Sequence, residues 1–112
     1  MESWLLLFMN IEEWGINMII NYDGSNFKEL IKEKVLVDFY ANWCGPCKML
    51  APELEKISND IKVVKVNVDE NPELAREYGV MSIPCIILFD KKEEVKRNVG
   101  FIPGVKLKEF IK

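Results

Sequence analysis

Residues 35–48 read VLVDFYANWCGPCK, an apolar run followed by two cysteines that are separated by two residues. The run Val35–Tyr40 is almost continuously apolar, as expected of a buried strand whose two faces are covered by helices. A helix is expected from Cys44 to about residue 59. The two thiols therefore lie at the junction between a strand and a helix, where they are placed to react.

This position favours Cys44 over Cys47 as the nucleophile. The N-terminus of a helix carries unpaired N–H groups and a partial positive charge, which stabilise a thiolate and lower its pKa. Pro46 lacks an N–H that would be unpaired there in any case, and Gly45 leaves room for a partner sulfur. We expect Cys44 to be exposed, and Cys47 to be shielded and to resolve a mixed disulfide.

Two other interpretations of the cysteine pair are weaker. A structural zinc site needs four ligands, but the chain has no histidine and only one further cysteine, Cys85, so we predict no metal site. A purely structural disulfide would close so short a loop that it would constrain the unfolded chain very little. Redox chemistry is the preferred interpretation.

The segment 37–48 resembles the thioredoxin family, and the resemblance continues through KVNVD at 65–69, Ser82-Ile83-Pro84 and Val99-Gly100. It covers about residues 18–112. The combination is specific, because Gly-Pro lies between the cysteines, an aspartate lies six residues upstream and Ile-Pro lies downstream. The resemblance implies the thioredoxin fold, an α/β fold with a central mixed β-sheet flanked by helices on both faces.

Length and composition agree with one thioredoxin domain over residues 18–112. A chain of 112 residues, 49% of them hydrophobic, can bury about two thirds of its unfolded surface. The formal charge of −3 comes with no basic cluster, which argues against nucleic acid as a partner. We expect a monomer.

Residues 1–17 form an N-terminal extension. Its apolar stretch Trp4–Met9 is too short to span a bilayer, and Glu2 stands where a signal peptide would carry positive charge. We expect no membrane association and a dispensable, weakly ordered extension. The alternatives are an amphipathic helix packed on the domain, a weak membrane or partner contact, and an upstream start that is not the biological one.

The rest of the chain alternates between strand and helix patterns. Strands are expected at 18–21, 35–40, 61–68, 85–90 and 94–99, the last two pairing antiparallel across residues 91–92. Helices are expected at 25–34, at 44–59, from Asn71 to a stop at Gly79, and at 103–112.

Asp38 interrupts an apolar strand, and burial of the anion is unfavourable, so its pKa should be raised. Such a carboxyl can accept a proton from the resolving thiol; the alternative is a structural acid bonded to backbone. The resemblance makes Asp38 the buried acid near the inner cysteine and Lys65 the lysine that pairs with it. Lys65 could instead be a strand-edge lysine with its ammonium in water.

Ile83-Pro84 begins an apolar strand, and the bond could be trans on base rates. By resemblance it is a cis-proline facing the dithiol, where the Ile83 backbone would pair with an extended client segment. The expected contact surface for client proteins is flat and apolar. It comprises Trp43, Gly45, Pro46, Gly79, Ile83, Pro84, Gly100 and Phe101.

Two positions depart from the common family pattern. Cys85 follows Pro84 where the family usually has threonine. We expect it to be a small buried filler; the alternative is a third thiol near the active site, open to glutathionylation, an off-pathway disulfide or metal binding. Tyr40 stands where tryptophan is common, which changes packing beneath the loop.

The resemblance implies a cytoplasmic thiol–disulfide oxidoreductase that reduces protein disulfides through Cys44 and Cys47 and carries no bound cofactor. Electrons are expected from NADPH through thioredoxin reductase, and the partners are that reductase and disulfide-containing clients. One alternative is a disulfide oxidant or isomerase, which would require export. The other is a binding module of a larger complex, for which the dithiol would be dispensable.

Overall fold

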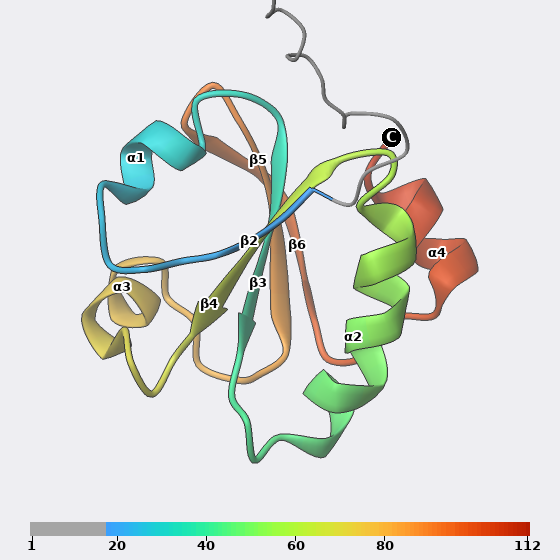
Figure 1. The fold of residues 1–112 in the computed structure, drawn as a ribbon, viewed down its shortest axis with the longest axis horizontal. Coiled ribbons are helices and arrows are strands. Elements are labelled where there is room, and N and C mark those ends of the chain that lie inside the picture. Colours follow the sequence, from blue (N-terminus) through green and yellow to red (C-terminus); the bar gives the residue numbers. More distant parts are fainter. Residues whose placement is uncertain (1–17) are drawn as a thin grey trace, which may run out of the picture.

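The computed structural model describes residues 18–112, which build a five-stranded sheet with helices on both faces (Figure 1). The strands are β2 (Ile19–Asn21), β3 (Val35–Tyr40), β4 (Lys62–Asn67), β5 (Cys85–Asp90) and β6 (Glu93–Val99). The helices are α1 (Phe27–Leu30), α2 (Gly45–Ile57), α3 (Pro72–Glu77) and α4 (Gly104–Phe110). The predicted extension, residues 1–17, lies outside the described residues.

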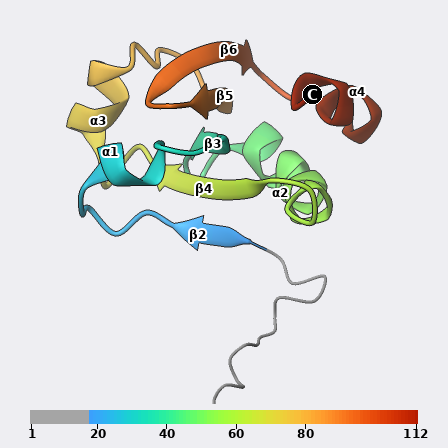
Figure 2. The same ribbon diagram turned by 90° about the horizontal axis from the view of Figure 1, so that it is seen from above.

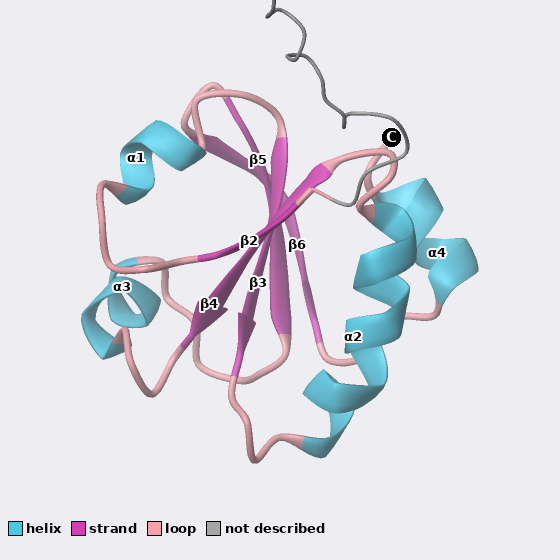
Figure 3. Ribbon diagram, viewed as in Figure 1, coloured by secondary structure: helices cyan, strands magenta, loops and turns pink. Residues whose placement is uncertain are grey.

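The strand order β2-β4-β3-β5-β6 places β3 at the centre of the sheet (Figure 2). β3 and β2 both run parallel to β4, whereas β5 runs antiparallel to β3 and to β6. Helices α1 and α3 cover one face, and α2 and α4 cover the other (Figure 3). This arrangement confirms the predicted α/β class with a mixed central sheet.

The side chains of β3 alternate between the two helix layers. Val37 and Phe39 pack in the core beneath α1 and α3, whereas Leu36 packs in the core beneath α2 and α4. Asp38 has the same parity as Leu36, so its carboxyl lies on the face of the sheet that α2 covers. The Asp38 side chain therefore points towards α2, the helix that begins at the cysteine pair.

Helix α1 is shorter than the predicted 25–34. It begins after Asn26, whose side-chain oxygen accepts the N–H of Lys28, and it ends at Leu30. The carbonyls of Ile31 and Lys32 accept N–H groups from the β5–β6 turn instead of from a further helical turn. A tertiary contact thus ends a helix that its own sequence would have continued.

No helix within residues 18–112 is long and apolar enough to cross a membrane.

Candidate active site

Cys44 is the N-cap of α2. Its backbone is extended, and its Sγ accepts a hydrogen bond from the backbone N–H of Cys47 at 3.2 Å. The two sulfurs lie at disulfide distance, with their Cα atoms 5.2 Å apart. Pro46 lies in the first helical turn, so the helix starts without an N–H that would need a partner. The pair therefore lies at the positive end of the α2 dipole, where a thiolate is stabilised.

The exposure of the two cysteines does not differ as predicted. Each residue is only 5% exposed. The prediction that Cys44 is the exposed one of the two is therefore wrong. Capping draws the Cys44 sulfur back over the first turn of the helix. The two residues differ instead in the spaces they border: Cys44 lines an open groove, and Cys47 lines a separate, smaller cavity.

The groove beside Cys44 has a volume of about 520 Å³ and is mostly apolar. Its walls come from the start of α2, the end of β4 and the segment before β5. The lining residues are Trp43, Cys44, Gly45, Pro46, Val68, Val80, Met81, Ser82 and Ile83. Four of the predicted contact residues, Trp43, Gly45, Pro46 and Ile83, thus lie together along it.

Trp43 forms the outer wall of the groove. Its side chain is among the most exposed apolar ones, at 70%, and its indole N–H donates to Asp69 Oδ2 at 2.9 Å. The backbone N–H of Asp69 in turn donates to Asn67 Oδ1 at 2.8 Å. These bonds fix an exposed aromatic ring beside the cysteines.

The Ile83–Pro84 peptide bond is cis, as the resemblance implied. Pro84 is buried, and its carbonyl accepts the N–H of Gly100 at 2.7 Å. Among residues 18–112, no backbone hydrogen bond outside the helices and strands uses the N–H or carbonyl of Ile83. The backbone of Ile83 is therefore free to pair with another chain.

The other predicted contact residues do not line the groove. Gly79 is exposed, has a positive φ of 65°, and borders a neighbouring groove together with Arg76. Gly100 has a φ of 96° and lies beside Pro84, and Phe101 is 41% exposed. These residues stay candidates for a wider contact surface.

Asp38 is 1% exposed, and its Oδ1 has no hydrogen-bond partner. Burial raises the pKa of Asp38 from 3.8 to about 7, and the positive charge of Lys65 only partly opposes that rise. The predicted upward shift is confirmed, because a charge in an apolar core loses its hydration. The alternative, a structural acid bonded to the backbone, is not supported for Asp38 Oδ1.

Lys65 is the register partner of Asp38 on the neighbouring parallel strand β4. It lines, together with Cys47, a cavity of about 140 Å³. Its ammonium lies 4.6 Å from the centroid of the Tyr40 ring, a cation–π distance. The acid, the lysine and the inner cysteine are thus brought to one side of the sheet from three elements.

Cys85 is fully buried on the opposite face of the sheet. It packs in the core beneath α1 and α3, and it is the free cysteine of the described chain. Burial raises the pKa of its thiol. The expectation of a buried filler is confirmed, and within residues 18–112 no group of three or more potential metal ligands is present.

Several groove residues were not identified from the sequence. Met81 is 94% exposed, although a methionine before an apolar strand is more often part of a core. Val80 carries no motif, and Ser82 matched the family only as part of Ser82-Ile83-Pro84 and was not assigned to the contact surface. Asp69 lies in a stretch that matched the family, but its bond to Trp43 spans 26 positions of sequence and has no local signal.

Comparison with known proteins agrees with this geometry. The thioredoxin family model matches residues 18–112. A thioredoxin of Staphylococcus saprophyticus is 47% identical over 98 residues, which cover 83% of this chain and 94% of that protein. A bifunctional thioredoxin reductase/thioredoxin of Mycobacterium leprae is 45% identical over 104 residues, which cover 88% of this chain and 22% of that protein.

Among solved structures, a mutant thioredoxin from Halobacterium salinarum superposes with a TM-score of 0.79 at 37% identity, covering 85% of this chain and 88% of that one. The cysteine pair at the start of α2 supplies thiol–disulfide oxidoreductase chemistry. The chain belongs to the thioredoxin family.

Proposed function

We propose that Cys44 and Cys47 reduce client protein disulfides in two steps with distinct roles. The observation that carries this proposal is the cysteine pair at the N-terminus of α2, beside an apolar groove. The Cys44 thiolate attacks one client sulfur, forming a mixed disulfide and releasing the other client sulfur as a thiolate. Cys47 then attacks Cys44 Sγ, which closes the Cys44–Cys47 disulfide and releases the second client thiolate. Two electrons pass to the client.

The second step needs an acceptor for the Cys47 proton, and Asp38 is the proposed acceptor. Its pKa of about 7 is near that of a general base that works at neutral pH. The chain has no histidine to serve instead. Lys65 is proposed to favour the ionised form of Asp38, the form that can accept the proton, because its positive charge opposes the rise in the Asp38 pKa and the two residues are register partners.

Clients are proposed to bind as extended segments. The free backbone of Ile83 can form strand-like hydrogen bonds with such a segment, while Trp43 and Pro46 supply apolar contact. Main-chain pairing is independent of client sequence. A wide range of protein disulfides is therefore expected to serve as substrates.

The oxidised pair must be reduced again for turnover. We propose that NADPH supplies the electrons through a thioredoxin reductase, which is a separate protein. This assignment is supported by the relative from Mycobacterium leprae, which is named as a reductase and a thioredoxin in one chain. We further propose that the protein acts as a monomer in the cytoplasm.

The test is insulin reduction with NADPH and a thioredoxin reductase. The reaction is monitored by the oxidation of NADPH and by the turbidity of reduced insulin. Activity is expected with all components and is expected to disappear without the reductase or with Cys44→Ser. A protein that fails to reduce insulin even after chemical reduction by dithiothreitol would contradict the proposal. Full insulin reduction by Cys44→Ser would contradict the role of Cys44, and a wild-type protein that does not reduce insulin would favour a binding module.

A further inference from the structure

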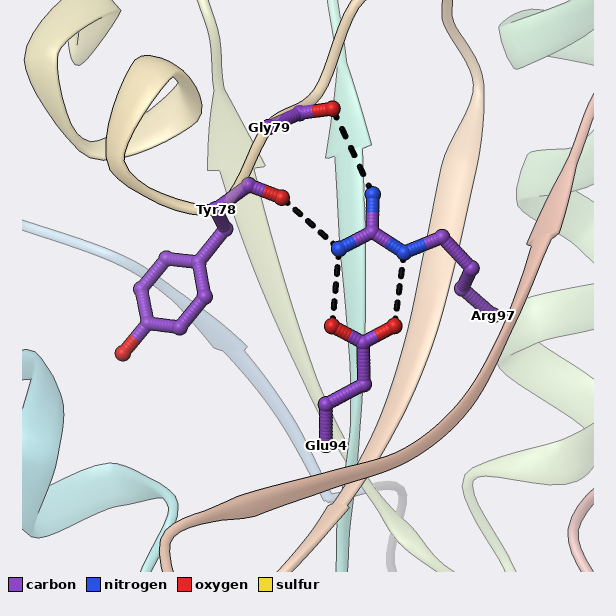
Figure 4. A network of polar contacts seen from close by, with 4 residues as sticks. All are labelled: Tyr78, Gly79, Glu94 and Arg97. Carbon is purple, nitrogen blue, oxygen red and sulfur yellow. Dashed lines mark hydrogen bonds and ion pairs between the residues drawn. The ribbon is translucent and has the colours of Figure 1, made fainter.

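Arg97 of β6 bonds both Glu94, on the same strand, and the residues that follow α3 (Figure 4). Its Nε lies 2.6 Å from Glu94 Oε2, and its Nη2 lies 2.7 Å from Glu94 Oε1. This two-pronged contact fixes the plane of the guanidinium. Both side chains are only about a third exposed, at 30% and 35%, so the pair is partly shielded from solvent.

The other N–H groups of Arg97 point at the end of α3. Nη2 also donates to the carbonyl of Tyr78 at 2.7 Å, and Nη1 donates to the carbonyl of Gly79 at 3.4 Å (Figure 4). Carbonyls in the last turn of a helix lack helical partners, and a cation is favoured beside them. Arg97 therefore caps α3 from a distant strand.

The chain that follows these carbonyls is the loop that lines the groove beside Cys44. Val80 is held to α3 by its N–H, which donates to Ala75 at 2.9 Å. Met81, Ser82 and Ile83 then run along the groove to Pro84. Residues 81–83 use no backbone hydrogen bond outside the helices and strands, so their position depends on how the two ends of the loop are held.

Arg97 also belongs to the strand that pairs with β5, the strand that follows this loop. Cys85, the first residue of β5, pairs with Val99, two positions along β6 from Arg97. The Arg97 charge partly opposes the rise that burial causes in the Cys85 pKa. Arg97 thus contacts the residues before the loop from a strand that pairs with the residues after it.

We propose that Arg97, held by Glu94, is a positioning residue that fixes the loop Val80–Pro84 for client binding. It touches neither sulfur, so it should act on the recognition of protein clients and not on the intrinsic reactivity of Cys44. The inference rests on the proposed function, in which Ile83 pairs with the client. The bonds from Arg97 to two backbone carbonyls are contacts beyond its ion pair with Glu94.

The test separates recognition from chemistry. The dithiothreitol-reduced protein is mixed with insulin or with 2-hydroxyethyl disulfide, a small disulfide that needs little of the groove, and single-turnover rate constants are measured. Arg97→Gln should lower the rate with insulin about fivefold, because it loses charge-assisted bonds to both carbonyls. The rate with the small disulfide should stay unchanged.

Two variants complete the comparison. Arg97→Lys keeps the charge but not the planar fork, and its rate with insulin should fall between the wild type and Arg97→Gln. Lys96→Gln removes a positive charge from the adjacent position, whose ammonium lies 5.2 Å from the centroid of the Phe110 ring, and should behave like wild type. Hydrogen exchange of the Val80 N–H, which donates to the Ala75 carbonyl, should be faster in Arg97→Gln, with α2 unchanged.

A wild-type rate with insulin for Arg97→Gln would overturn the inference. An equal loss with insulin and the small disulfide would also overturn it, since it would indicate general damage. If Arg97→Gln does not fold, Arg97→Lys decides by the same ratio of rates. A wild-type protein that reduces the small disulfide but not insulin would count against the proposed function and not against Arg97 in particular.

Discussion

Asp38 and Lys65 are register partners on β3 and β4, yet the Lys65 ammonium lies over the Tyr40 ring. The ion pairs between described residues do not include Lys65, so no pair within 4.0 Å neutralises the buried acid. This arrangement leaves the Asp38 carboxyl poised to change its protonation near neutral pH. Full pairing with Lys65 would instead hold it ionised.

Replacing Asp38 by asparagine should stabilise the oxidised protein more at pH 8 than at pH 4. For an acid whose folded pKa is raised, the destabilisation is absent below the unfolded pKa, grows between about 4 and about 7, and is constant above. A rise of the Asp38 pKa from 3.8 to about 7 corresponds to a loss on the order of 4 kcal/mol in the free energy of unfolding above that pKa. Chemical unfolding of both proteins at the two pH values measures the difference.

The same variant should resolve mixed disulfides more slowly, because the acceptor for the Cys47 proton is lost. Single-turnover insulin reduction measures this effect. A variant that is less stable at neutral pH and fully active would contradict the role proposed for Asp38.

Removing the charge of Lys65 should raise the pKa of Asp38 further. In Lys65→Gln the positive charge that opposes the burial effect is gone, so the carboxyl should ionise only above about pH 7. The pH optimum of disulfide resolution should move upward with it. Titration of the Asp38 carboxyl by carbon-13 NMR checks the direction, with Lys62→Gln on the same strand as the control.

The proposed roles of the cysteines predict different trapping behaviour. Cys47→Ser should accumulate covalent mixed disulfides with clients through Cys44, because attack still occurs and resolution cannot. Cys44→Ser should accumulate few. Non-reducing electrophoresis with mass spectrometry identifies the linked cysteine, and equal capture by both variants, or capture through Cys85, would show that the roles are assigned wrongly.

Cys85 should be unreactive in the folded protein. Its thiol is fully buried and its pKa is raised, so little thiolate forms and reagents cannot reach it. Thiol titration of the oxidised protein should find almost no reactive group under native conditions and one after denaturation. Rapid native labelling would favour a regulatory thiol instead.

Removal of residues 1–17 should leave insulin reduction unchanged and stability within about 1 kcal/mol. Every residue in the proposed mechanism lies at or after Asp38. The truncated chain should begin at Met18, because the Met18 carbonyl accepts the N–H of Val63 at 2.8 Å. A large loss of stability would indicate that Trp4, Leu7 and Trp14 pack against the domain.

The strand β3, the helix α2 and the cysteine pair between them could be predicted because their signals are local. A continuous apolar run, a helix start with Gly-Pro, and a charge inside a strand each follow from residues that are neighbours in the sequence. The raised pKa of Asp38 was predictable for the same reason, since an acid in a buried strand loses its hydration wherever the strand is placed.

Tertiary structure alone decided which groups meet. The end of α1 at Leu30 depends on a turn some 60 positions away, whose N–H groups take the Ile31 and Lys32 carbonyls. Capping by Cys44 Sγ buries a thiol that its position in the sequence would expose. The bonds from Trp43 to Asp69 and from Arg97 to Tyr78 join residues that are far apart in the sequence, and only packing of the sheet brings their polar atoms within reach.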